Sequence, residues 1–455
     1  MAQSLTPELT DGILDALGRI NRELAARYPG ESEARQPVHT VYGGAQIFKA
    51  DTAAKLGSVA LNALKEYAPT APVFAKALQM PGGAGLHKKV YDRLIGKLRR
   101  EPIEDFRIDF EDGYGNRPEE EEDRHAESAA NEVARGMAES TLPPFIGFRV
   151  KPFTEDLKAR SIRTLDLFIS TLAGKTGGKL PPGFVVTLPK VLAPDHVQAL
   201  DRLLTALESR LSLSRGTLKI ELMIETPQSI FTAQGTIALP SLVAAAGGRC
   251  VAAHFGVYDY TASNNITAQF QSMVHPACDF ARSVMKVSLA GTGIWLSDGA
   301  TNIMPVGPHR AAQGKKLTPK QKKENLAAVH RIWKLNFEHI NHSLMNGIYQ
   351  GWDLHPAQLP VRYAAVYAFF QQELATASNR LRIFMEKAAQ ATLIGDVFDD
   401  AATGQGLLNF FLQGIGCGAI EEAEARNTGL SLDEIRSRSF VRILKGRRSG
   451  HRAKE

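Results

Sequence analysis

Arg107-Ile-Asp-Phe-Glu-Asp-Gly-Tyr114 has the pattern of a buried strand that runs into a cluster of carboxylates and then a glycine. Its acids, Asp109, Glu111 and Asp112, are costly to desolvate without a cation, an arginine or hydrogen-bond donors nearby. Such a cluster at a strand end marks either a functional site or a solvated end with capping acids. The remainder of the chain has to decide between these two interpretations.

A short β-rich run followed by a longer helical stretch repeats along the chain. Eight runs are candidate strands, at 40–48, 106–111, 145–151, 184–191, 219–225, 251–258, 293–296 and 351–354. Helical patterns with apolar residues three or four apart lie between them, at 51–67, 118–139, 154–173, 194–212 and 228–246. Near-continuous apolar strands that alternate with helices predict a parallel sheet covered on both faces. Eight such units favour a closed (β/α)8 TIM barrel over an open sheet.

The pattern divides the chain into an N-terminal helical segment, 1–37, a barrel, 38–360, and a helical C-terminal extension, 361–455. An insertion at 76–104 interrupts the barrel. Its Met80-Pro-Gly-Gly-Ala-Gly85 turn lacks the preceding strand and the spacing of a phosphate loop, so we expect a mobile flap with a basic helix after it. Gly404-Gln-Gly406 resembles half of a dinucleotide fingerprint, but helical sequence surrounds it, and we do not expect a cofactor loop there.

Charge and composition indicate a globular cytoplasmic protein. The net charge is +6, but the tail Lys445–Glu455 alone holds five basic residues against one acid, so the body is close to neutral and we expect no nucleic-acid partner. No apolar run is long enough to span a bilayer and the N-terminus has no secretory pattern, so we expect no membrane partner. Three widely spaced cysteines, Cys250, Cys278 and Cys417, indicate a reducing compartment without a disulfide framework or a thiolate zinc site.

Two carboxylates at neighbouring strand ends are candidate metal ligands. Glu225 ends the fifth candidate strand and Asp259 follows the sixth. Because parallel strands lie about 4.8 Å apart, two such side chains can bind one hard cation. Two protein oxygens with open positions suit Mg²⁺, with Mn²⁺ as a substitute. The alternative is a pair of carboxylates hydrogen-bonded to the barrel loops.

Two cations follow the third and fourth candidate strands. Arg149 lies within an apolar run and needs a carboxylate or an oxyanion, so it either pairs with Asp109 or Glu111 or donates to an oxygen that gains charge during a reaction. Lys190 has the position of a Schiff-base lysine, but beside a metal pair we favour an electrostatic or structural role.

Six motifs in chain order resemble the superfamily of the citrate lyase β-subunit, malyl-CoA lyase and the HpcH/HpaI aldolases. They are Asp109-Phe-Glu-Asp112, Phe148-Arg-Val150, Leu188-Pro-Lys190, Ile224-Glu-Thr226, Phe255-Gly-Val-Tyr-Asp259 and Leu354-His-Pro-Ala-Gln358. Each motif is weak alone, but six in register across residues 38–360 are specific. The insertion, the helical C-terminus and Gly351-Trp-Asp353, where relatives usually have Gly-Lys, mark a divergent member.

The resemblance implies a barrel of the phosphoenolpyruvate/pyruvate-binding type that cleaves or forms a carbon–carbon bond next to a 2-oxo acid with Mg²⁺. It implies that Glu225 and Asp259 bind metal and substrate and that Arg149 binds the substrate oxyanion. Glu111 would orient metal waters or Arg149, with Asp109 and Asp112 in support. The substrate would be a small 2-oxo or hydroxy acid, as a free acid or a CoA thioester.

The general base and the assembly are less defined by the sequence. Asp298 and His355 are candidate bases, although His355 precedes a proline in a turn, where histidine is more often structural. We expect a homo-oligomer, because in relatives the C-terminal region of a neighbouring subunit helps to complete the site. Two alternatives stay open: a malyl-type thioester hydrolase on the same barrel, and a non-catalytic regulatory barrel.

Overall fold

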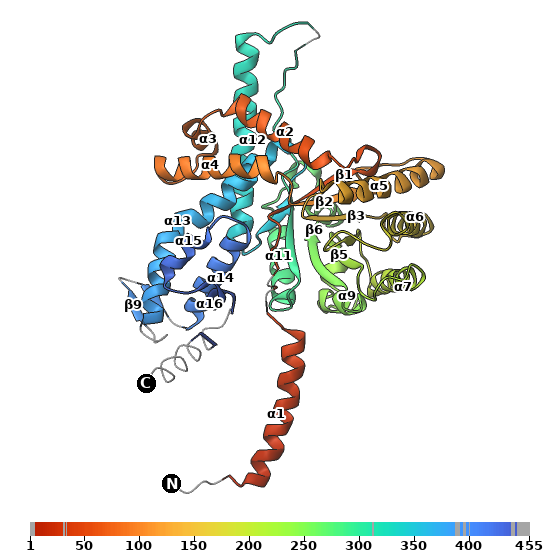
Figure 1. Ribbon diagram of the computed structural model, residues 1–455, viewed down its shortest axis with the longest axis vertical. Helices are drawn as coiled ribbons and strands as arrows, with labels where there is room; N and C mark the ends of the chain where they lie inside the picture. The colour runs from red at the N-terminus through yellow and green to blue at the C-terminus, as the bar shows by residue number, and fades with distance from the viewer. Residues whose placement is uncertain are drawn as a thin grey trace.

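The eight predicted strands form one closed parallel barrel in the computed structural model, which describes residues 5–30, 32, 34–311, 314–386, 392–394, 397–399, 401–437 and 442–443 (Figure 1). Neighbours in the barrel are neighbours in the chain, and β1 closes it against β8. The strands are β1 (His39–Gly44), β2 (Asp105–Asp109), β3 (Phe145–Arg149), β4 (Val185–Leu188), β5 (Lys219–Ile224), β6 (Cys250–Phe255), β7 (Trp295–Ala300) and β8 (Gln350–Trp352). The fold is the (β/α)8 barrel that the sequence predicts.

The seventh strand lies later in the chain than predicted. The sequence pattern places it at 293–296, whereas β7 begins at Trp295 and ends at Ala300. Gly293 has a φ of 78°, a left-handed conformation that a strand does not contain. Asp298 therefore lies inside a strand and not in the loop after it.

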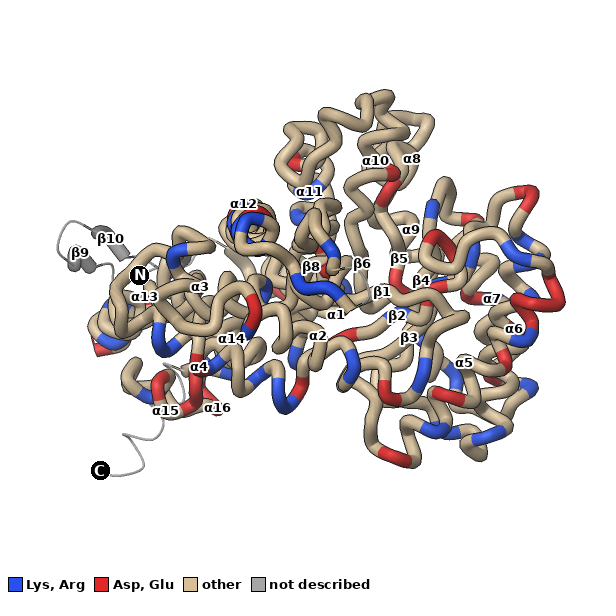
Figure 2. The backbone as a smooth tube through the Cα atoms, turned by 90° about the horizontal axis from the view of Figure 1, so that it is seen from above, with Lys and Arg blue, Asp and Glu red and all other residues tan. Residues whose placement is uncertain are grey.

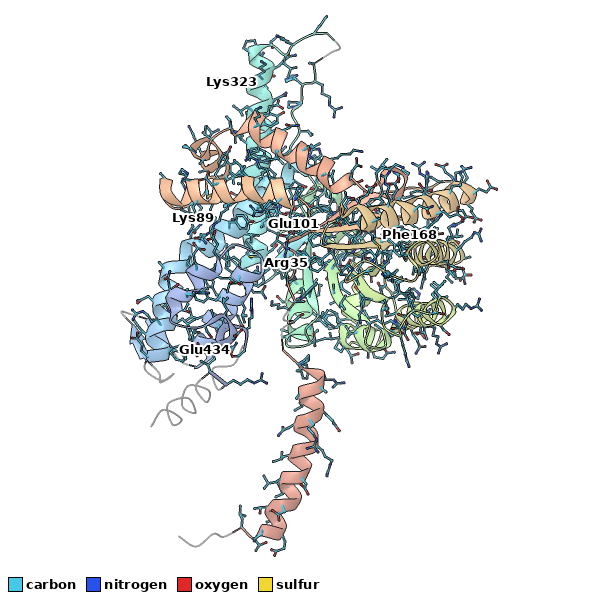
Figure 3. The ribbon with its side chains drawn as sticks, viewed as in Figure 1. Arg35, Lys89, Glu101, Phe168, Lys323 and Glu434 are labelled. Atoms are coloured by element: carbon cyan, nitrogen blue, oxygen red, sulfur yellow. The ribbon has the colours of Figure 1, made fainter. Side chains whose placement is uncertain are left out.

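Helices cover the outside of the barrel, and apolar side chains fill the space between the two layers. The helices that follow the first seven strands include α2 (Thr52–Tyr67), α5 (Glu119–Glu139), α6 (Lys158–Thr176), α7 (Pro194–Arg210), α9 (Leu239–Ala245), α11 (Pro276–Leu289) and α12 (Pro319–Met345). Phe148 on β3 stacks on Phe168 of α6 with ring centroids 4.2 Å apart, and Phe184 extends the stack (Figure 3). Burial of each such ring contributes roughly 1.5–3 kcal/mol to stability.

The prediction of a single helix at 228–246 is wrong. It divides into α8 (Pro227–Ile230) and α9, with a short hairpin between them. Phe231 forms an antiparallel bridge with Ile237, and Gly235 at a φ of 76° makes the turn that links them. The left-handed glycine ends the helical pattern that the apolar spacing indicates.

The insertion is a packed pair of helices and not the mobile flap that we expected. It contains α3 (Ala71–Leu78) and α4 (Ala84–Arg100), and α4 contacts α3, α2 and α13 (Leu359–Glu386). Val90, Leu94 and Leu98 are buried along one face of α4. Lys89 points to the C-terminal helices and forms an ion pair with Glu424 (Figure 3).

The C-terminal extension is helical, as predicted, with one addition. It contains α13, α14 (Ala401–Gly416), α15 (Glu422–Ala425), a 3-10 turn η4 (Arg426–Thr428) and α16 (Leu432–Arg436). An antiparallel pair, β9 (Thr392–Ile394) with β10 (Val397–Asp399), precedes α14. The two glycines of the half fingerprint lie within α14, which agrees with the expectation of no cofactor loop. The basic tail lies outside the described residues.

The first helix, α1 (Pro7–Arg27), projects away from the barrel on a short linker (Figure 1). Viewed at right angles, the helices around the barrel carry basic and acidic segments that alternate along the chain (Figure 2). None of the described helices has the length and apolar character needed to span a membrane.

Candidate active site at the carboxyl end of the barrel

Arg149 and the first carboxylate cluster meet at the carboxyl ends of β2 and β3. The strand register aligns Asp109 with Arg149. The Arg149 Nε donates to Asp109 Oδ1 at 2.7 Å and its Nη2 donates to Oδ2 at 2.6 Å, a bidentate pair. Its Nη1 lies 2.8 Å from Glu111 Oε2. Both structural partners considered for this arginine are therefore present at once.

Two aromatic rings lie against the Arg149 guanidinium, and the sequence analysis did not assign either of them. The guanidinium carbon lies 4.8 Å from the Tyr42 ring centroid and 5.6 Å from that of Trp352. Arg149 is 1% exposed, so these rings and the acids hold it in one position. The only sequence signal was Trp352 itself, which stands where relatives usually have lysine.

Asp109 is an anchor for the loop that follows β2. It accepts the backbone N–H of Glu111 at 3.0 Å and that of Gly113 at 2.8 Å. Burial opposes ionisation, but Arg149 and these backbone donors outweigh it, so the pKa of Asp109 lies below its usual value. Asp109 therefore stays charged and fixes both Arg149 and the turn that carries Glu111.

Lys190 lies among the carboxylates of the rim. Its ammonium pairs with Glu111 and lies 3.5 Å from both Asp112 Oδ1 and Asp259 Oδ1. Its φ of 48° is left-handed, a costly conformation for a residue with a side chain. Burial opposes the ammonium form, but Glu111, Glu225 and Asp259 hold the pKa of Lys190 above its usual value. A protonated lysine fits the electrostatic role and not a Schiff-base nucleophile.

Glu225 is the most perturbed acid of this rim. It directly follows β5 and is 1% exposed, and its Oε1 accepts the Lys190 backbone N–H at 2.7 Å. Burial and the charges of Asp259 and Glu111 raise the pKa of Glu225 to about 8. Gly256 leaves the space for this side chain, since a Cβ there would lie 2.6 Å from the Glu225 Cβ. The chain thus brings a buried carboxylate into an environment that opposes its charge.

Asp259 lies at the same rim, although not at a strand end. It is in the first turn of α10 (Val257–Ser263), and its side chain is 39% exposed. Lys190 links the two acids, because its ammonium lies near Asp259 and its backbone N–H donates to Glu225. The structure therefore brings the two predicted metal ligands to one place.

Asp298 does not reach this rim as a free base, and we withdraw it as a catalytic candidate. Its carboxylate pairs with the Arg282 Nε at 2.8 Å and accepts from the Ser343 hydroxyl at 2.6 Å and the Gly299 backbone at 2.8 Å. It is 1% exposed. Asp298 on β7 thus forms a buried ion pair with Arg282 of α11 and accepts a hydrogen bond from Ser343 of α12. It holds this position because β7 begins later than predicted.

His355 is structural, the interpretation that the sequence favoured. Its Nδ1 accepts the Ala357 backbone N–H at 3.1 Å and caps the 3-10 turn η3 (Pro356–Gln358). Burial lowers its pKa. The imidazole is thus engaged as an acceptor in the cap.

The rim as a whole holds more negative than positive charge. Arg149 and Lys190 are the cations that contact its acids, which are Asp109, Glu111, Asp112, Glu225 and Asp259. Within the described residues, no group of three or more His, Cys, Asp or Glu side chains is placed to enclose a metal ion.

One family matches nearly the whole chain. It is described as a domain of unknown function (DUF6986), and the match covers residues 17–443. The chain belongs to this family. No curated protein matches it.

Solved structures resemble this DUF6986 chain in fold. A citrate lyase from Burkholderia xenovorans LB400 is 16% identical with a TM-score of 0.56, over 87% of this chain and 96% of that one. CitE from Mycobacterium tuberculosis, solved with magnesium, acetoacetate and coenzyme A, is 14% identical with a TM-score of 0.46, over 85% and 100%. A Haloferax volcanii malate synthase, as a magnesium/glyoxylate complex, is 15% identical with a TM-score of 0.45, over 88% and 99%. At this identity the likeness to the citrate lyase shows the barrel fold alone.

Proposed function

We propose that this DUF6986 chain is a Mg²⁺-dependent carbon–carbon lyase or aldolase that acts next to a 2-oxo acid such as glyoxylate, pyruvate or oxaloacetate. The observation that carries the proposal is Glu225, a buried carboxylate beside Asp259 whose pKa is raised to about 8. The Lys190 ammonium contacts Glu111 and Asp259, whereas Glu225 accepts the backbone N–H of Lys190. A second cation beside Glu225 would stabilise its charged form.

The residues present fit Mg²⁺ by the chemistry of their donors. Glu225 and Asp259 would hold the ion, since one or two carboxylates are the usual protein share of such a site. The glycine at 256 gives Glu225 the room to lie at the rim. When bound, the ion would supply a Lewis acid for the keto and carboxylate oxygens of the substrate.

Arg149 would stabilise negative charge that develops on the substrate. Two of its five N–H groups donate to Asp109 and its Nη1 forms an ion pair with Glu111, so N–H groups remain that would donate to a substrate oxygen. In the cleavage direction a base takes the proton of the substrate hydroxyl, whose oxygen forms the new carbonyl as the carbon–carbon bond breaks. The electron pair of that bond passes to the oxygen of the departing enolate. A guanidinium fixed by two acids and two rings needs no reorganisation to share that charge. Glu111 and Asp109 would keep it in place.

The six sequence motifs support the same function. Their charged members, Glu111, Arg149, Lys190, Glu225 and Asp259, come from five separate segments and lie together at one rim. An idle barrel has no need of this combination. A metal and an arginine at this rim suit a small acid with two adjacent oxygens. This acid would be either free or part of a CoA thioester.

A thermal shift experiment tests the proposal without knowledge of the substrate. Oxalate, pyruvate and glyoxylate are each added with and without Mg²⁺ or Mn²⁺, and the melting temperature is recorded. We expect a rise only when acid and metal are both present, because bound ligand stabilises the folded state by about 2.7 kcal/mol at a hundredfold excess over Kd. The absence of a metal-dependent shift with every acid would refute the metal–enolate reading.

An activity screen then separates the remaining options. It combines the three 2-oxo acids with CoA thioesters and with free acids, in the presence of Mg²⁺, and follows both synthesis and cleavage. Carbon–carbon bond formation or cleavage supports the lyase. Release of free CoA without a new carbon–carbon bond would identify the thioester hydrolase in its place.

A further inference from the structure

The first helix has an apolar face that no described part of its own chain covers. Along α1, Leu9, Ile13, Leu17, Ile20 and Leu24 are each between 47% and 54% exposed. No described residue of this helix is buried. Figure 1 shows α1 extended away from the barrel, which it meets only at its last turn and linker. In proteins most of the stability of a helix comes from the packing of its apolar face, so this exposed face requires a partner.

The spacing of the apolar face is that of a helix pair. Ile13, Leu17, Ile20 and Leu24 follow one another at intervals of four, three and four residues. These are the intervals of the a and d positions of a coiled coil. The small residue Ala16 lies beside the row, and a small side chain there lets two helix backbones approach closely.

We propose that α1 pairs in antiparallel orientation with α1 of a second copy of this chain. The charges of the helix favour this partner and this direction. Its first half carries Glu8, Asp11 and Asp15, and its second half carries three arginines, at 19, 22 and 27, against Glu23. Antiparallel pairing places acidic half against basic half at both ends, whereas parallel pairing opposes like charges. The two helix dipoles also point in opposite directions in the antiparallel pair, which is favourable.

The same charges argue against a membrane as the partner. Helices that lie on membranes are rich in Lys and Arg on the polar face. In α1 the four acidic residues outnumber the three basic ones. An anionic lipid surface would repel the half that contains Asp11 and Asp15.

The linker holds the helix in a direction that leaves the active site open. The Gly30 N–H donates to the Gly291 carbonyl at 2.8 Å, and Arg35 lies 2.8 Å from Glu104. Ser32 and Ala34 lie at the amino end of the barrel, beside the cavity that Asp105 and Arg107 border. A paired rod of 21 residues, about 32 Å long, would therefore join two barrels by their amino ends. Both carboxyl rims would face solvent.

The mass of the full chain in solution tests the pairing. Light scattering after gel filtration of the 49.6 kDa chain should give twice that mass, with dissociation on dilution. The variant Leu17→Asp/Leu24→Asp should halve the mass at the same concentration. Ala25→Asp/Ala26→Asp adds the same two charges to the opposite face of α1 and should leave the dimer intact. Unchanged melting temperatures of the barrel would show that each variant folds.

Cysteine cross-linking tests the direction. In the antiparallel register Ile13 faces Leu24 of the second copy, so a mixture of Ile13→Cys and Leu24→Cys chains should form the mixed disulfide. Either variant alone should form little, with the wild-type chain as the blank for its three native cysteines. Disulfides within each single variant would show a parallel pair and overturn the proposal.

Other outcomes also decide against it. A monomeric wild-type chain would overturn the pairing, and so would a dimer that survives Leu17→Asp/Leu24→Asp. A monomer that co-sediments with phosphatidylcholine/phosphatidylserine vesicles would assign the apolar face to lipid. These measurements do not depend on metal or substrate, so they stand apart from the proposed function.

Discussion

Two clusters of buried charge lie inside the same barrel, and they differ in how their charges are satisfied. The lower cluster, Arg107 with Asp105 and Glu221, lies toward the amino end beside a cavity of about 490 Å³. The upper cluster is the rim around Arg149 and Lys190. Each cluster contains a buried arginine and buried acids. Burial alone therefore does not distinguish a structural cluster from a catalytic one.

The lower cluster is satisfied by its own neighbours. Glu221 Oε1 accepts from the Thr187 hydroxyl at 2.7 Å and from the Arg107 Nε at 3.1 Å. Asp105 Oδ2 accepts from the Thr40 hydroxyl at 2.9 Å and its other oxygen pairs with Arg107. Burial opposes ionisation of Glu221, yet Arg107 and its other neighbours hold its pKa below the usual value. This is the pattern of a network that supports the fold.

Acids outnumber cations in both clusters, and burial raises the pKa of Asp105 in the lower one to about 6. In the upper cluster no described cationic side chain forms an ion pair with Glu225, and burial and its acidic neighbours raise its pKa to about 8. A protein tolerates such a group when function requires it. The difference teaches that the lack of a direct cationic partner for Glu225, more than burial, distinguishes the two clusters. Variants of either cluster test this difference.

The largest effect is expected at Glu225. Glu225→Gln keeps an oxygen for the Lys190 N–H but removes the charge that would bind Mg²⁺. We expect metal-dependent turnover and the metal-dependent oxalate shift to be lost, a fall of a thousandfold or more, on the order of 4 kcal/mol. The metal-free variant should melt no lower than the wild type, because ionisation of Glu225 is unfavourable in the folded state.

Glu127→Gln on the exposed face of α5 is the matched control and should change neither quantity. Asp259→Asn should reproduce the loss. Full turnover in either rim variant would show that the metal binds elsewhere.

The next effect is expected in the lower cluster and in stability alone. Arg107→Met leaves Asp105 and Glu221 buried without their cation, which should lower the free energy of unfolding by about 3–5 kcal/mol. Urea unfolding measures this, with Arg163→Met on the surface as the control. The oxalate shift of the folded variant should persist. If ligand response vanished in a folded Arg107→Met protein, the lower cluster would be part of the site.

Arg149→Lys should affect catalysis more than stability. Lysine keeps the charge but not the fork that contacts Asp109 and Glu111 together. We expect kcat to fall about a hundredfold or more, comparable to loss of one oxyanion donor. Arg163→Lys is the control. An unchanged kcat with a raised KM would assign Arg149 to substrate binding only.

The sequence predicts the barrel well because its signal is repeated. Eight apolar runs between amphipathic helices leave few alternatives, and a local error, such as the start of β7, does not change the topology. That same error misplaced Asp298, because a shift along a strand decides whether a residue lies on the rim or between the barrel and its helices. The sequence indicates strand boundaries only weakly, and Gly293 was the only local indication of where β7 begins.

The members of the site were predictable but their contacts were not. Glu111, Arg149, Lys190, Glu225 and Asp259 follow strands in the pattern of the sequence, and the fold brings them together. Tyr42 was missed because nothing in a single sequence shows which aromatic side chain points into a barrel. The raised pKa of Glu225 depends on three segments that meet only in space.

A smaller effect is expected from acid at His254, whose ring lies near Glu221 of the lower cluster. His254 lies 3.0 Å from the Tyr42 hydroxyl, and burial lowers its pKa to about 4. Between pH 6.5 and 4 the unfolded chain binds a proton that the folded one does not, so stability falls as pH falls, by about 2 kcal/mol at pH 5. Urea unfolding of His254→Gln should show a smaller loss between pH 7 and pH 5 than the wild type. An equal loss in both would assign the acid sensitivity to other groups.

The smallest effect is expected at Trp352, whose ring lies against Arg149 of the upper cluster and against His254. Its ring lies 4.4 Å from that of Tyr42, and its buried Nε1 has no hydrogen-bond partner among the described residues. Trp352→Phe keeps a ring against Arg149 and removes only this donor, so the free energy of unfolding should change by less than about 1 kcal/mol. If the indole N–H donates to a substrate oxygen, oxalate affinity in the presence of Mg²⁺ should fall up to about tenfold. Titration calorimetry measures it, and an unchanged affinity would mean that the ring serves only to hold the arginine.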